Sequence, residues 1–410
     1  MARTLAILGS GMRLTDQVSI GLLARTYPRS AIDSALDRSG LPPGRNRLLP
    51  VHVVVYYVLA LGLFMEASIQ EVLRCLLDSL GHFGMEPSKV ATKGAISQAR
   101  TRVGVEPLRQ LFLSCCRPLG TPSIRGCFWK GLRVMAMDGT TLDTQDTQAN
   151  EDAFGRSKSG RGETAFPQLR MTLLAECGSH AVVGAAFGSY RDSERTLARE
   201  MTDRLDKKML LLADRGFIGH DIWATFSQSG AQLLWRVGSN IKLEPIKTLK
   251  DGSTLALLNA SKESARTGAQ AITVRVIEYE LDGVAKPDTE GARYRLITTL
   301  LDPREAPALE LARLYQERWE IEILLDELKT HLRGRSALLR SKTPDLVKQE
   351  AYGLLLVHHA VRRIMLDAAQ SIGDDPDRIS FTATVRIIRR KLLQGSFSPL
   401  DEQGSVEEEL

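Results

Sequence analysis

Cysteine and histidine are scarce in this sequence of 410 residues. The five cysteines form no C-x-x-C pair, and such a scattered, odd-numbered set excludes a disulfide framework. The histidines are dispersed too, apart from His358 and His359, which would point to different sides of a helix and make a poor metal chelate. These absences exclude a zinc site built from Cys and His, and they predict a protein of the reducing cytoplasm.

Long hydrophobic runs are also missing. The longest, Val51–Met65, is interrupted by His52 and Gly62 and is too short to span a bilayer. It predicts a buried helix instead. The first residues, MARTLAILGSGMRL, contain too short an apolar stretch for a signal peptide. We therefore expect neither secretion nor insertion into a membrane.

A strong excess of charge of one sign is the third absence. The net charge is +5 and the isoelectric point is near 8.9. This permits a nucleic-acid partner without requiring one. With 43% hydrophobic residues the chain can bury a sizeable core, and its length predicts two or three domains.

Residues 1 to about 125 read as a helical domain. One of its predicted helices, Lys93–Val103, carries the basic residues Lys93, Arg100 and Arg102. A basic helix in a compact helical domain suits DNA binding, but a structural or oligomerising domain fits equally well. Prolines and glycines between Arg117 and Lys130 then mark a linker.

Strands and helices alternate beyond the linker, which predicts a mixed α/β sheet. We expect residues 145–166 to form a surface loop and residues 238–292 to form a β-rich insertion. Past Arg333 the chain reads as helical again, with helices at Pro344–Asp367 and Phe381–Leu393 and an acidic, disordered tail. The expected strands are Leu132–Met137, Gln168–Ala175, Ala181–Phe187, Met209–Ala213, Gln232–Val237 and Tyr294–Leu300, with helices at Glu194–Leu205 and Phe217–Ser227.

The stretch Leu311–Leu332, LARLYQERWEIEILLDELKTHL, predicts one long helix with an apolar face. At roughly 100° of rotation per residue, four further side chains share a stripe about 60° wide. They are Tyr315, Arg318, Glu322 and Lys329. The stripe is either a functional surface or a solvated face with ordinary ion pairs, such as Arg318 with Glu322.

Two aspartates stand at the ends of predicted strands, Asp138 after the first and Asp214 after the fourth. If these strands are neighbours, the two carboxylates converge on one edge of the sheet, and a helix across that edge can add Glu322. Three carboxylates on rigid elements suit Mg²⁺ or Mn²⁺. Two such ions about 4 Å apart serve phosphodiester chemistry.

Three motifs in this order carry a family resemblance: MDGTTLD at 137–143, ADRGF at 213–217 and YQERWEIEILLDELK at 315–329. Together they resemble the DDE transposases of bacterial insertion sequences, and more narrowly the insertion-sequence-four family. The resemblance implies a ribonuclease-H-like catalytic domain at 126–338. A helical, DNA-end-binding domain at 1–125 and a helical region at 339–410 would flank it.

The resemblance also implies a mechanism. Asp138, Asp214 and Glu322 would bind two Mg²⁺ or Mn²⁺ ions, and a metal-activated water would cleave DNA at the transposon ends. The freed 3′-OH would then attack target DNA in a cut-and-paste reaction. Double-stranded DNA would be the partner, with a homodimer formed on it. Tyr315, Arg318 and Lys329 are the residues implied to contact phosphates.

Several assignments stay open at this stage. Asp326 or Asp143 could serve as a metal ligand in place of a triad member. Arg215 and Thr140 could contact DNA or could serve turn structure.

An aromatic residue holds a flipped base in some relatives. Trp235 and Trp319 are candidates for that role, and we expect both to be core residues.

Two rival functions are weighed against this interpretation. DGTTL at 138–142 is similar to a haloacid dehalogenase phosphatase motif, but the nucleophile position there is Ala136, so that chemistry is excluded. The second rival is a non-catalytic DNA-binding protein of the same family, decayed or domesticated. The complete acidic set favours the enzyme.

Overall fold

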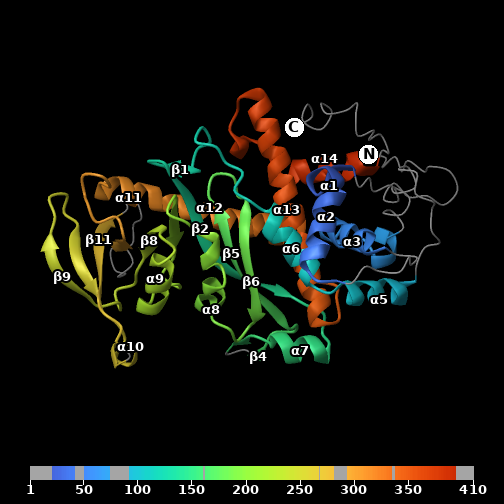
Figure 1. The fold of residues 1–410 in the computed structure, drawn as a ribbon, viewed down its shortest axis with the longest axis horizontal. Coiled ribbons are helices and arrows are strands. Elements are labelled where there is room, and N and C mark those ends of the chain that lie inside the picture. The colour runs from blue at the N-terminus through green and yellow to red at the C-terminus, as the bar shows by residue number, and fades with distance from the viewer. Residues whose placement is uncertain are drawn as a thin grey trace. The chain divides into compact units, whose positions relative to one another are not determined.

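The computed structural model describes residues 21–41, 50–73, 92–159, 162–266, 268–280, 293–334 and 338–393 (Figure 1). The chain divides into two compact units. The helical unit comprises Met1–Arg117, Leu142–Leu169 and Leu325–Leu410, and the sheet unit comprises Pro118–Thr141 and Arg170–Leu324. The predicted acidic tail after Leu393 lies outside the described residues.

A mixed sheet dominates the sheet unit, as the sequence predicts. Its strand order is β6-β5-β2-β7-β8-β12-β11-β10-β9, with β1 paired to β2. The first five strands of this order follow the ribonuclease-H-like arrangement. The strands are β1 (Phe128–Trp129), β2 (Leu132–Asp143), β5 (Gln168–Glu176), β6 (Val182–Ser189), β7 (Met209–Ala213), β8 (Gln232–Arg236), β9 (Leu243–Thr248), β10 (Thr254–Leu258), β11 (Ile272–Glu280) and β12 (Arg293–Thr298).

The wholly apolar strand β7 lies between β2 and β8 and runs parallel to both. Four of its five residues are buried, as expected of a strand covered on both faces. Helices α8 (Glu194–Arg199) and α9 (His220–Ser227) contribute to the same core. There Trp223 packs edge-on against Trp235, with ring centroids 5.2 Å apart.

The β-rich segment continues the same sheet. Strands β9, β10 and β11 pair in antiparallel order, and β12 joins them to β8. The fully buried Arg275 of β11 ties this part together. It donates to Asp251, Ser253 and the carbonyl oxygens of Leu300 and Ala306, so that its charge and donors are matched.

Two expectations about the first half of the catalytic region are corrected. The strand predicted to end before Asp138 continues through Asp143. The expected loop at 145–166 contains helix α7 (Gln148–Phe154) and the short pair β3 (Lys158–Ser159) and β4 (Gly162–Glu163). Thr147 caps α7 by accepting from Asn150 N, which is a local signal that the polar composition concealed.

The helical unit is built around α3 (Val51–Leu63) and α13 (Pro344–Ile372). They cross at two glycines: a Cβ on Gly353 would lie 2.6 Å from Val58 O, and one on Gly62 would lie 2.8 Å from Gly353 O. The helices approach so closely because neither position has a side chain. Besides α7, the described part of this unit also contains α1 (Gly21–Thr26), α2 (Arg29–Arg38), α5 (Lys93–Val103), α6 (Glu106–Cys115) and α14 (Phe381–Leu393).

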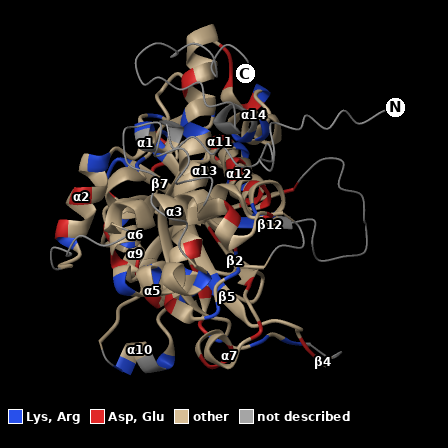
Figure 2. Cartoon of the chain, turned by 90° about the vertical axis from the view of Figure 1, so that its right-hand side faces the viewer, with Lys and Arg blue, Asp and Glu red and all other residues tan. Residues whose placement is uncertain are grey.

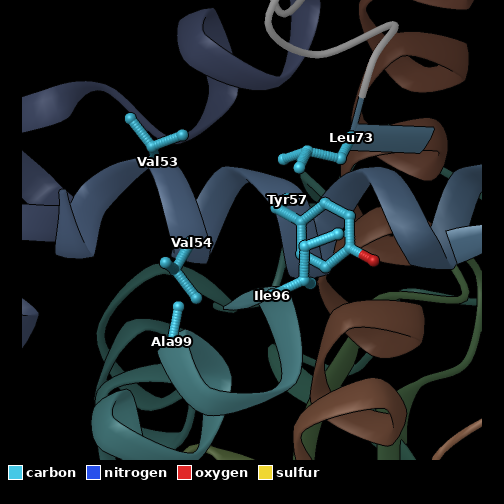
Figure 3. A pocket seen from close by; sticks show the side chains of 6 residues that line it. All are labelled: Val53, Val54, Tyr57, Leu73, Ile96 and Ala99. Atoms are coloured by element: carbon cyan, nitrogen blue, oxygen red, sulfur yellow. The ribbon is translucent and has the colours of Figure 1, made fainter. Parts of the chain in front are cut away.

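A small pocket lies between α3 and α5 (Figure 3). Apolar atoms line it, from Val53, Val54, Tyr57, Leu73, Ile96 and Ala99. The one polar lining group, the Tyr57 hydroxyl, donates to Ile69 O at 3.1 Å. With its polar atom already bonded, the pocket offers no group to orient a ligand, and we assign it to packing.

Two arginines, one buried and one partly buried, join distant parts of the helical unit. Arg100 of α5 is 3% exposed and donates to Gln349 Oε1, Ser341 Oγ and Leu346 O. Arg340 donates to the fully buried Glu350 at 3.0 Å. One cation of the predicted basic helix is therefore a structural residue and is not available to DNA.

Charges of both signs are interspersed along the chain, in keeping with its small net charge (Figure 2). Among the described helices, none combines the length and the apolar character needed to cross a membrane.

Candidate active site

The predicted helix Leu311–Leu332 is helical throughout but changes type. It consists of α11 (Ala308–Leu314), a 3₁₀ segment at Tyr315–Arg318, α12 (Trp319–Asp326) and a π segment at Glu327–Leu332. Because the turns tighten and then widen, the side chains do not follow one regular stripe. The division between the compact units falls after Leu324, so Lys329 belongs to the helical unit.

Asp138 and Asp214 occupy equivalent places on neighbouring strands. β2 and β7 are parallel, and their register pairs Met137 with Ala213. Asp138 and Asp214 are the residues that directly follow this pair in the chain. Both side chains are partly buried. The convergence expected from the sequence is therefore confirmed for this pair.

Each aspartate accepts a hydrogen bond from a nearby backbone amide. Gly139 N donates to Asp138 Oδ1 at 2.8 Å, and Gly216 N donates to Asp214 Oδ1 at 2.7 Å. The pKa of Asp138 is raised to about 6, chiefly by burial and further by the charges of Asp214 and Glu194. The Gly139 amide and the Arg318 guanidinium only partly offset these effects. The pair is thus a place where a cation is favoured.

Tyr315 joins the 3₁₀ segment to β7. Its hydroxyl donates to Ala213 O at 3.1 Å, next to Asp214, and its side chain is buried. The pKa of Tyr315 is raised, mainly by burial. The hydroxyl therefore anchors the 3₁₀ segment to the end of β7, directly before Asp214.

Arg318 and Glu322 form an ion pair one turn apart, with Arg318 Nη2 donating to Glu322 Oε1 at 2.7 Å. The arginine side chain is 9% exposed, whereas the glutamate is 40% exposed. Burial alone would lower the pKa of Arg318. The pKa is nevertheless raised, because the hydrogen bond to Glu322 and the charges of Tyr315, Glu322 and Asp138 outweigh burial. Arg318 thus contacts Glu322 directly, and its charge also acts on Asp138.

Glu194, the first residue of α8, is a fourth carboxylate at this edge. Its side chain lies directly over Gly139, where a Cβ would clash with it, and its charge raises the pKa of Asp138. Arg170 lies 4.0 Å from it. The sequence does not single out this residue, because Glu after a Ser cap is an ordinary way to begin a helix. The glycine of D-G-T is a signal for such a residue, because a position without a side chain lets a neighbouring group such as Glu194 come close.

The alternative ligands lie in the helical unit and have other partners. Asp143, at the end of β2, accepts from Gln168 Nε2 at 2.8 Å. Asp326 accepts from Thr330 Oγ1 at 2.6 Å and lies 3.2 Å from His331 Nε2. Within the described part of the chain, the carboxylates of Asp138, Asp214 and Glu322 do not all gather within 4.8 Å of one another.

The remaining site candidates differ in accessibility. Arg215 is exposed beside Asp214, and Thr140 is partly buried within β2, where it forms strand rather than turn. Trp235 is fully buried, as expected. Trp319 is 57% exposed, so the expectation that it is a core residue is wrong. Its neighbour Arg318 lies over its ring at 5.0 Å.

The residues at this edge fit a hard divalent cation. Every donor is a carboxylate oxygen, the ligand type that Mg²⁺ and Mn²⁺ prefer. The charge of Asp214 disfavours ionisation of Asp138, and a cation beside Asp138 would offset that effect. Glu322 is also a carboxylate, and its Oε1 accepts from Arg318 Nη2 in this structure.

Comparisons with known proteins identify the family of this chain. Residues 17–113 match the family model of the insertion element 4 transposase N-terminal region, and residues 129–359 match that of the transposase DDE domain. The second match contains Asp138, Asp214, Glu322 and Lys329.

Curated relatives include the transposase InsG for insertion sequence element IS4 of Escherichia coli K12. It is 29% identical over 373 residues, covering 89% of this chain and 81% of InsG. The putative transposase InsZ of the same strain is 30% identical over 219 residues, covering 53% of this chain and 71% of InsZ. A solved piggyBac transposase synaptic complex with hairpin DNA aligns over 97% of this chain and 83% of its own, at 10% identity and a TM-score of 0.47.

Proposed function

The chain belongs to the family of DDE-domain transposases, and on this premise we propose that it cuts DNA at the ends of a transposable element and joins the freed 3′-OH to target DNA. The observation that carries the proposal is the pair Asp138 and Asp214 at equivalent places on two adjacent parallel strands. This pair is held by rigid elements and is short of positive charge.

We assign the metal site to Asp138, Asp214 and Glu322. Bound there, Mg²⁺ or Mn²⁺, as one ion or two, would activate the attacking oxygen and stabilise the leaving oxygen of a phosphodiester. The two aspartates supply ligands whose positions are set by the sheet. Glu322 supplies a ligand on a helix, and its position depends on Arg318 and on the 3₁₀ segment before it.

The proposed DNA contacts divide by accessibility. Arg215 and Thr140 adjoin the aspartates in the chain, and with Lys329 they are our candidates for phosphate contacts. Tyr315 and Arg318 are buried, so we assign them to shaping the carboxylate site. Trp319, which is exposed on the helix of Glu322, becomes the candidate to stack on an unpaired base.

The helical segment matched by the N-terminal family model is proposed to bind the element's ends. Lys93 and Arg102 of α5 are exposed and suit this role, whereas Arg100 is not available. Joining two ends requires two active sites, so we propose that the protein works as a homodimer on double-stranded DNA.

A strand-cleavage assay tests the proposal, using duplexes that carry the element's ends with Mg²⁺ present. We expect the wild type to release a 3′-OH. Asp138→Asn and Glu322→Gln should lower cleavage by at least the roughly 10- to 100-fold seen when a partner of a metal ligand is lost. Asp326→Asn, on the same helix as Glu322, should cleave within about threefold of the wild type.

Two outcomes would contradict the assignment. If the wild type and Glu322→Gln cleave alike, Glu322 is not a ligand. If every variant binds the ends and none cleaves, including the wild type, the chain is a DNA-binding protein without catalysis.

A further inference from the structure

The turn between β5 and β6, Cys177–Ala181, reaches the helix that carries Glu322. His180 of this turn lies with its Nε2 2.7 Å from Glu320 Oε2 of α12. We propose that His180 is a positioning residue, which acts through Glu320 to fix the rotation of α12 about its axis and thereby the side to which Glu322 points. This inference rests on the proposed function, in which Glu322 is a metal ligand.

The turn is a rigid support for such a contact. Glu176, the last residue of β5, is fully buried, and its Oε2 accepts from Leu119 N at 2.9 Å and from Gly120 N at 2.6 Å. Ser179 Oγ donates to the same oxygen atom. Hydrogen bonds that converge on one buried carboxylate hold the backbone before His180 in a single arrangement.

The backbone of His180 is itself strained. Its φ is 54°, in the left-handed region that residues other than glycine disfavour. Its side chain is only 4% exposed. Such a conformation persists where the surrounding contacts over-determine it, and it recurs at functional sites. Here the strained residue is the one that reaches α12.

The geometry of α12 explains why a contact at Glu320 affects Glu322. Residues two apart in an α-helix point about 200° apart around the axis, so these two glutamates face nearly opposite sides. Tyr315 fastens the preceding 3₁₀ segment to β7, and His180 holds α12 at the β5–β6 turn. Because α12 has only eight residues, attachment at two separate places leaves it little freedom to roll.

A second approach joins the turn to the same helical stretch. Glu317 Oε2 lies 2.7 Å from the place that a Cβ on Gly126 would take, and Gly178 Cα of the turn lies 3.2 Å from that place. A Cβ on Gly178 would clash with Arg125 O. The two glycines therefore allow a close approach. The turn meets the helical stretch at two positions one turn apart, Glu317 and Glu320.

Loss of the His180–Glu320 contact should free α12 to roll. Glu322 would then occupy the position of a metal ligand for less of the time, so metal affinity should fall. Loss of a group that orients a metal ligand costs about 10- to 100-fold in metal affinity or activity. A purely structural role would lower the Tm and leave the metal affinity unchanged.

The experiment compares the full-length wild type with His180→Asn, His180→Gln and Glu320→Ala. Asn tolerates the left-handed backbone but ends too close to it to reach Glu320, whereas Gln places its amide nitrogen near the position of Nε2. Glu310→Ala in α11 is the matched control, because it also removes a glutamate with a cationic partner, Lys130 Nζ at 2.9 Å.

Two measurements need no DNA and no catalysis. Mn²⁺ alone is titrated by calorimetry, and amide hydrogen exchange of α12 is followed without metal. We expect His180→Asn and Glu320→Ala to bind Mn²⁺ about tenfold more weakly than the wild type, with α12 amides that exchange faster. His180→Gln should recover most of the affinity, and Glu310→Ala should match the wild type. If His180→Asn does not fold, Glu320→Ala decides.

The double variant His180→Asn/Glu320→Ala should bind Mn²⁺ no more weakly than the weaker single variant, because both changes break one contact. Additive losses would overturn the proposal. So would wild-type Mn²⁺ affinity in both single variants, whatever their Tm. Equal Mn²⁺ binding by the wild type and Glu322→Gln would instead overturn the metal site of the proposed function.

Discussion

Two groups of partly or fully buried charges, one in each compact unit, differ in how many partners they have. In the helical unit Arg340 is matched by Glu350, which also accepts from Ser341 N and Ser341 Oγ. In the sheet unit, among the residues that the structure describes, Asp138 accepts one hydrogen bond, from the amide of Gly139. The first group is saturated with partners, whereas the second is left short of positive charge.

The number of partners around a charged group indicates whether the group serves stability or function. A saturated network stabilises a unique arrangement of helices and offers nothing to a ligand. An undersupplied group of carboxylates costs stability and is retained where a cation or substrate completes it. Burial alone does not distinguish the Arg340–Glu350 group from the Asp138 group, whereas the number of hydrogen-bonding and charged partners does.

The largest effect should come from breaking the saturated group. Glu350→Ala leaves the partly buried Arg340 without its counter-charge, and loss of one partner of a buried pair costs up to about 3–5 kcal/mol. Chemical denaturation measures this loss. Asp367→Ala, at an exposed position of the same helix, is the control and should change the free energy of unfolding by no more than about 0.5 kcal/mol. A small loss for Glu350→Ala would show that the network contributes little.

The next effect concerns the glycine crossing that brings α3 and α13 together. Alanine favours a helix over glycine by up to about 1 kcal/mol. At Gly353 the added Cβ would meet Val58 O at 2.6 Å, so we expect Gly353→Ala to destabilise by about 1–3 kcal/mol. Gly94→Ala in α5, where the nearest atom is 3.9 Å away, should instead stabilise by about 0.5–1 kcal/mol. The same sign at both positions would contradict the close crossing.

The undersupplied group should respond to pH in the opposite way to a salt bridge. The folded pKa of Asp138, about 6, lies above the ordinary value of 3.8. The folded protein therefore holds a proton that the unfolded chain has lost. Stability from this group is present below pH 4 and is lost as the pH rises to 6.

Asp138→Asn should abolish that loss. In metal-free buffer at pH 7 it should be more stable than the wild type by on the order of 1 kcal/mol, while near pH 4 the two should agree. Thermal melts at both pH values test this, and Asp33→Asn gives the baseline for an exposed carboxylate. An Asp138→Asn protein that is less stable at pH 7 would mean that Asp138 is already well compensated.

The smallest effect belongs to exposed pairs. Arg29 Nε and Asp33 Oδ1 are 3.0 Å apart, and both side chains are about half exposed. Asp33→Asn should lower the free energy of unfolding by no more than about 0.5 kcal/mol. The expected loss should vanish in 1 M salt, which screens exposed charges. A larger, salt-resistant loss would show that exposure is a poor guide to the worth of a charge in this protein.

Local patterns in the sequence were sufficient for the parts of the fold that depend on a few neighbouring residues. The run MLLLA predicted β7 with its observed bounds, and Phe381–Leu393 was predicted as a helix and is one. Asp138 and Asp214 were recognised because strand ends in a parallel sheet meet at one edge. Motif spacing then indicated the family, which the comparisons support.

What the sequence determined by itself is therefore the mixed sheet, the aspartate pair and the family. Only the tertiary structure decided that Arg100 is buried against Gln349, that Glu194 lies over Gly139, and that Gly353 meets Val58. The reason is physical. Periodicity and propensity act over a few residues, whereas these contacts join positions far apart in the chain, and they exist only once the path of the backbone has brought them together.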